Sequence, residues 1–147
     1  MTNELDERVR QALYAWFNLL PAGVAAIQEQ AIDGLGVHVV PTKQGCTDVM
    51  VAFSGGDTVD IHWGDGFQVE QIRSEPDFVV QVCEAIRRGR LRVERWTLAG
   101  ATILTKGTID VGSERLDDRL LATLSFLKQF AIRSVEYGVP WDPETVC

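Results

Sequence analysis

The chain has 147 residues, of which 46% are hydrophobic and 24% charged, and its formal net charge is −7. This length and composition predict a single domain, residues 1–147, whose core needs neither disulfides nor a structural metal. The acidic surface argues against binding to nucleic acid or to an anionic membrane, and no apolar run is long enough to span a bilayer. The three scattered cysteines (Cys46, Cys83 and Cys147) and the charged start of the chain predict a reduced, cytoplasmic protein.

The first 33 residues predict a helical segment. Leu5, Val9, Leu13 and Trp16 recur every three to four residues, which is the apolar stripe of a helix, and Pro21 would end that helix. The sequence AGVAAIQEQAI, residues 22–32, favours a second and shorter helix.

Alternation of apolar and polar residues then predicts strands at 37–40, 47–54, 58–63 and 67–73. A three-residue loop at 64–66 would pair Trp63 with Phe67 and gather apolar side chains on one face, whereas a two-residue loop would not. Asp65 is then a turn residue. A similar loop at 55–57 continues the same pattern into the preceding strand.

The second half predicts a helix at 75–88, strands at 91–96 and 101–111, a long helix at 113–138 and a tail at 139–147. Gly107 would mark a bulge or bend in its strand, and Ser113 would cap the long helix. The predicted order is α-α-β-β-β-β-α-β-β-α. Such an order favours an α+β fold, with a mostly antiparallel sheet of about six strands within 37–111 and helices on one face.

The predicted register places Asp48, Asp60, His62 and Glu70 on the face of the sheet away from the helices, with Asp60 opposite Glu70. Two carboxylates in that position repel each other unless water, a cation, an arginine or a basic partner relieves them. The face is therefore a solvated surface, a docking surface for a basic protein, or a metal or acid–base site. His38 would share this face, but Met50 would stand between it and His62.

A basic strip stands out against the acidic background. Its members lie in residues 86–96 and are Arg87, Arg88, Arg90, Arg92 and Arg95. We expect them to form ion pairs within the protein or with a partner, and phosphate binding is the alternative. An antiparallel sheet could bring Arg90 and Arg92 beside Asp60 and Glu70, but the sequence does not determine whether it does. The strip lacks the interleaved aromatic residues of a single-strand binder. Trp141, in the tail, either folds back onto the body or anchors a partner.

The order of elements, the size and the acidity resemble those of two groups of bacterial proteins, the secretion chaperones and the immunity proteins that neutralise secreted toxins. The predicted strand at 67–73 and the predicted helix at 22–32 are additions to the chaperone pattern. The resemblance implies a non-enzymatic protein that binds another protein. No specific cofactor or metal motif occurs in the sequence, and we expect neither a cofactor nor a metal.

We therefore expect a module that docks a basic protein through Asp48, Asp60, His62 and Glu70, with Trp141 as a further contact. One alternative is a small metal-dependent enzyme that uses Asp60, His62 and Glu70. The other is a structural homodimer formed through a strand edge or the long C-terminal helix.

Overall fold

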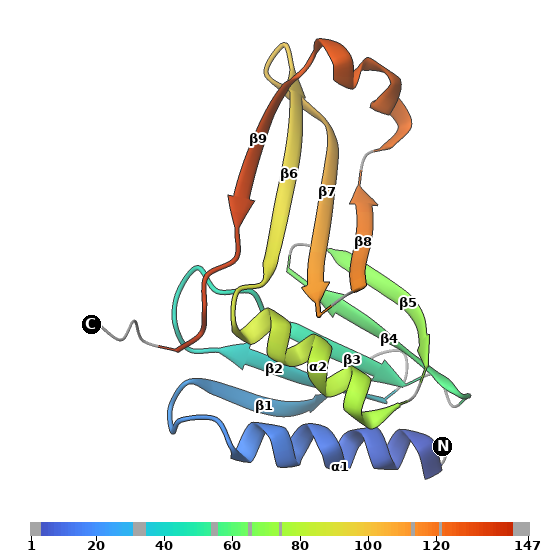
Figure 1. Ribbon diagram of the computed structural model, residues 1–147, viewed down its shortest axis with the longest axis vertical. Coiled ribbons are helices and arrows are strands. Elements are labelled where there is room, and N and C mark those ends of the chain that lie inside the picture. The colour runs from blue at the N-terminus through green and yellow to red at the C-terminus, as the bar shows by residue number, and fades with distance from the viewer. Residues whose placement is uncertain are drawn as a thin grey trace.

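The computed structural model describes residues 4–30, 35–53, 56–64, 66–73, 75–112, 114–120 and 122–142 (Figure 1). Asp65, Ser113 and residues 143–147, which were part of the sequence predictions, lie outside the described residues. The elements in chain order are α1 (Glu4–Asn18), β1 (Ala25–Gln30), β2 (Leu35–Pro41), β3 (Val49–Phe53), β4 (Thr58–Trp63), β5 (Phe67–Arg73), α2 (Pro76–Arg87), β6 (Leu91–Leu98), β7 (Ala101–Val111), β8 (Glu114–Leu120), the 3₁₀ helix η1 (Ala122–Phe130) and β9 (Ile132–Tyr137). The predicted α+β class is confirmed.

The strands form two antiparallel sheets instead of the one predicted. The first sheet has the order β1-β2-β3-β4-β5, and the second has the order β8-β7-β6-β9. Figure 1 shows that α1 and α2 lie beside the first sheet, while the second sheet projects away from it and carries η1 at its far end.

The core lies between the first sheet and the two helices. On the sheet, the inward residues include Val49, Val51, Ile61 and Trp63, all of them buried, as the alternation predicted. From the helices, α1 contributes Val9, Leu13 and Trp16, and α2 contributes Val79, Val82 and Ile86. The predicted pair of Trp63 with Phe67 is formed, and across the preceding turn Phe53 pairs with Val59, which continues the predicted pattern.

The β4–β5 hairpin departs from the predicted register beyond Ile61. Ile61 pairs with Val69, but Val59 pairs with Ile72, so two β5 residues, Glu70 and Gln71, lie opposite Asp60 alone. The predicted direct pairing of Asp60 with Glu70 is therefore wrong. The bulge places Ile72, which is buried, opposite Val59 in the position where an unbroken alternation would place Gln71.

The predicted second helix at 22–32 is wrong, because residues 25–30 form the edge strand β1. Ile27 lies opposite Val39 and Glu29 opposite Val37, so both face the helices. There Glu29 accepts hydrogen bonds from Arg10 and from Tyr14 of α1. Pairing with β2 and these contacts outweigh the helical preference of alanine, glutamine and glutamate.

The predicted long helix at 113–138 is also wrong. This stretch forms β8, η1 and β9, and the two strands lie at opposite edges of the second sheet. Leu116 and Leu120 of β8 are half-buried against the core. Residues four apart lie on the same face of a helix, about one turn apart, and also on the same face of a strand, where side chains alternate every two residues. The leucine pattern therefore did not distinguish the two structures.

Glycines allow the two sheets to approach each other. A Cβ atom on Gly107 of β7 would lie 2.6 Å from Trp63 and 2.8 Å from Phe67, so close contact and not a bulge explains this residue. Where the chain enters and leaves the second sheet, a Cβ on Gly89 would lie 2.8 Å from the Gly138 carbonyl oxygen. Gly89 has φ +72°, a conformation that favours glycine.

Candidate functional site

The outer face of the first sheet, the face away from α1 and α2, carries most of the predicted site residues. One row of outward residues crosses all five strands and consists of Gln28, His38, Met50, His62 and Gln68, each paired with the next. The expectation that Met50 stands between the two histidines is confirmed. We call this surface, together with Asp48, Asp60 and Glu70, the acidic face.

Asp48 and His38 form a direct pair at one end of the acidic face. The His38 Nε2 atom lies 2.7 Å from an Asp48 carboxylate oxygen, and both side chains are partly exposed. A depression of about 200 Å³ is lined by these two residues, by Met50 and His62 and by the β4–β5 turn. The sequence identified Asp48 but gave no signal that it binds His38, because the contact joins a loop to a neighbouring strand.

The other two acidic residues lie along the same face. Glu70 is exposed and accepts a hydrogen bond of 3.0 Å from the Gln68 amide. Asp60 is half-buried and lies opposite Ala52 of β3. Within the part of the chain that the structure describes, no three His, Cys, Asp or Glu side chains are grouped as a metal ion would need. Asp60, His62 and Glu70 share a face but do not form a compact ligand set.

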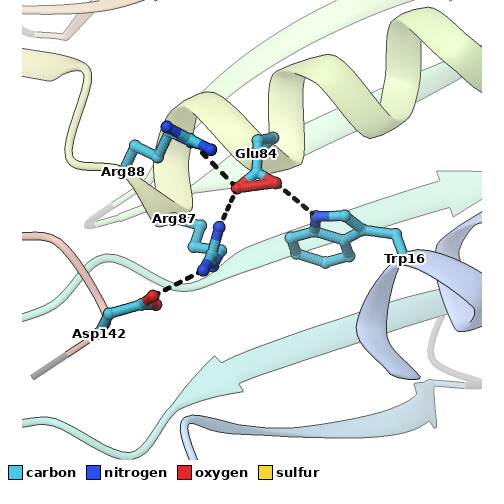
Figure 2. A network of polar contacts seen from close by, with 5 residues as sticks. All are labelled: Trp16, Glu84, Arg87, Arg88 and Asp142. Carbon is cyan, nitrogen blue, oxygen red and sulfur yellow. Dashed lines mark hydrogen bonds and ion pairs between the residues drawn. The ribbon is translucent and has the colours of Figure 1, made fainter. Parts of the chain in front are cut away.

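Two members of the basic strip belong to a polar network that joins α2 to α1 and to the tail (Figure 2). Glu84 accepts hydrogen bonds from Arg87, from Arg88 and, at 3.1 Å, from the Trp16 indole. Arg87 also donates to Asp142 at 2.6 Å. Burial alone would raise the pKa of Glu84, but these hydrogen bonds outweigh it and hold the pKa below its ordinary value. Two carboxylates thus balance two guanidinium groups, which explains both arginines without phosphate.

The remaining arginines of the strip have other surroundings. The Arg92 Nε atom lies 3.4 Å from a carboxylate oxygen of the buried Glu94. The Arg95 guanidinium lies 2.7 Å from a carboxylate oxygen of Glu136 on β9. Arg90 is exposed beside Arg87 and Arg88. The sequence left open whether Arg92 neighbours Asp60 and Glu70. In the structure β6, which carries Arg92, lies in the second sheet between β7 and β9 and not beside β4 or β5.

Trp141 belongs to the core and does not offer a docking surface. It is 1% exposed, and its ring lies 6.1 Å from that of Trp16. Its indole N–H donates to the Thr47 carbonyl at 2.9 Å, and its backbone N–H donates to the Arg87 carbonyl at 2.8 Å. The alternative that this residue folds back onto the body is the one that the structure shows.

Comparison of the chain with protein-family models, with curated proteins and with solved structures finds no match. Among the described residues, no helix combines the length and the apolar character that crossing a bilayer requires.

Proposed function

We propose that this protein is a non-enzymatic binding module that docks a basic segment of another protein on the acidic face. The arrangement of the first sheet carries the proposal. Its inner face packs on α1 and α2, whereas its outer face presents Asp48, Asp60 and Glu70 beside two histidines. Complementary charge on a basic partner would speed association and favour that partner over acidic proteins.

The depression beside Asp48 suggests how the partner is held. Its volume of about 200 Å³ lies below the 300–1,000 Å³ or so of small-molecule pockets, and suits a single inserted side chain. A lysine of the partner would lay its aliphatic stem along Met50 and direct its ammonium group to the Asp48 carboxylate. Glu70, further along the face, would attract a second cation.

The role is of the kind that immunity proteins and secretion chaperones perform. The order of elements departs further from the chaperone pattern than the sequence predicted, since strands stand in place of its last helix. The proposal therefore rests on the acidic face and not on that resemblance.

Titration of ¹⁵N-labelled protein with a ten-residue lysine-rich peptide tests the proposal. We expect chemical-shift changes concentrated at His38, Asp48, His62 and Glu70, and affinity that falls as salt is added. Glu70→Lys should raise the Kd roughly tenfold, which corresponds to about 1.4 kcal/mol.

The matched control is Glu114→Lys, which makes the same charge change at an exposed position on β8 of the second sheet. It should leave the Kd within about twofold of the wild-type value. Shifts spread evenly over the surface, or equal weakening by the two variants, would show a general attraction to an acidic protein and would overturn the proposal.

A further inference from the structure

We propose that two copies of this chain associate through β9, so that the second sheet continues across a twofold axis into the second sheet of the other copy. Four strands from each copy would then form one antiparallel sheet of eight. This inference concerns a different sheet from the acidic face and does not depend on the proposed function.

The two edges of the second sheet differ in a way that favours β9. Five of the seven residues of β8, the other edge, are charged, and such charge protects an edge from pairing with a further strand. Only two of the six residues of β9 are charged, and each is paired with an opposite charge within its own sheet. Arg133 donates to Glu94 at 2.8 Å, and Glu136 accepts from Arg95 at 2.7 Å. Each charge on β9 therefore has an opposite charge beside it on β6, and β9 carries fewer charges than β8.

Large apolar side chains are exposed on and beside β9. Ile132 at one end of the strand is 78% exposed, and Tyr137 at the other end is 73% exposed. Phe126 and Phe130 of the preceding η1 are also mostly exposed. Apolar side chains grouped in this way mark interaction surfaces, and here they flank a strand edge along its length.

One hydrogen bond indicates which backbone groups of β9 face outward. The Gly138 N–H donates to the Leu91 carbonyl at 2.8 Å, and the β6–β9 register continues from there without a shift. Because hydrogen-bonded pairs alternate in antiparallel sheets, Glu136, Ser134 and Ile132 bond toward β6. The N–H and C=O groups of Arg133, Val135 and Tyr137 therefore point to the free edge, where a second strand can bind them.

Symmetry and charge then favour a register centred on Val135 over registers centred on a charged residue. A twofold axis perpendicular to an antiparallel sheet places one residue opposite itself in the other copy. An axis at Arg133 or at Glu136 would oppose like charges. An axis at Val135 instead places Arg133 opposite Tyr137 of the second copy, a cation–π pair, and Ser134 opposite Glu136 of the second copy. The edge is thus complementary to itself in this register.

Sedimentation equilibrium from micromolar to millimolar protein is the first test, and we expect a reversible dimer. Ser134→Glu should then raise the dimer Kd at least tenfold, since it opposes Glu136 of the second copy on both sides of the axis. The monomer should stay folded, because Ser134 lies opposite Arg95 within its own sheet and the new glutamate would therefore face an opposite charge. Ser134→Gln, similar in size but uncharged, is the control. Ser134→Glu combined with Glu136→Lys should restore the dimer.

A disulfide tests the register. With the axis at Val135, the two Val135 Cα atoms would lie about 5.5 Å apart, within disulfide range, whereas the two Ser134 Cα atoms would lie about 8 Å apart. In a background with Cys46→Ser and Cys147→Ser, Val135→Cys should therefore cross-link under mild oxidation and Ser134→Cys should not. A protein that stays monomeric at millimolar concentration overturns the proposal. A dimer that Ser134→Glu leaves intact, or that cross-links at residue 134 but not at 135, overturns it as well.

Discussion

Gly107→Ala should destabilise the protein through a single added methyl group. The position lies in the interior of β7, between the two sheets, and its φ angle is not in the positive range that favours glycine. The new Cβ would meet Trp63 at 2.6 Å and Phe67 at 2.8 Å. Carbon atoms pack at about 3.5–4.0 Å, so the two aromatic rings or the β7 backbone must move.

The expected cost follows from two opposing effects. Overpacking a filled core costs about 1–3 kcal/mol, whereas alanine stabilises a strand interior by about 0.5–1 kcal/mol relative to glycine. We expect the free energy of unfolding to fall by about 1–2 kcal/mol. For a chain of this size the melting temperature should fall by roughly 2–8 °C.

Urea unfolding followed by tryptophan fluorescence measures this cost, and a double-mutant cycle assigns it. Trp63→Phe removes the ring carbon nearest to Gly107. In that background Gly107→Ala should therefore cost at least about 0.5 kcal/mol less than it does in the wild type. If Gly107→Ala leaves stability unchanged, or if the two substitutions are simply additive, Trp63 does not pack on Gly107 and the described junction of the sheets is incorrect.

Three further outcomes can be checked directly. Trp141→Phe should cost about 1–3 kcal/mol in urea unfolding, because it keeps an aromatic ring but leaves the Thr47 carbonyl without its indole donor. The hydrogen bond from Arg10 lowers the pKa of Glu29 in the folded protein. The ionised carboxylate therefore stabilises the fold at pH values above its unfolded pKa, and this stability is lost as the pH falls through the folded pKa. Glu29→Gln should make the free energy of unfolding depend less on pH in the acid range. Burial raises the pKa of Cys83 to about 12, so this thiol should resist a thiol reagent at pH 8 in the folded protein and react once urea is added, as mass spectrometry of the labelled peptides would show.

The hairpins of the first sheet could be predicted because a one-residue slip would turn every side chain to the wrong face. That constraint fixed the pairing of Trp63 with Phe67 and the outward direction of His62. It failed only at the bulge, where an extra residue resets the alternation before Ile72. Local alternation contains no signal for such an insertion except the buried isoleucine itself.

The site predictions succeeded where they needed only the face of a strand and failed where they needed a distant partner. Asp48, His62 and Glu70 lie on the predicted face, since alternation alone determines it. The partners of Arg87 and Arg95 come from segments remote in the sequence, Asp142 and Glu136, which spacing cannot reveal. The strand β1 was missed for the same reason, because its stability comes from pairing with β2 and not from its own residues.

The position of Trp141 has a consequence for the order in which the protein can fold. Its indole bonds to Thr47, 94 residues earlier, and its ring packs beside Trp16 of the first helix. Contacts between residues so far apart in the sequence form late, and they lower the rate of folding. When the whole first sheet of a nascent chain has emerged from the ribosome, the ring of Trp141 that packs beside Trp16 is still missing. We expect the core around Trp16 to close only after residue 141 has emerged, so α1 completes its packing only when the end of the described chain is in place.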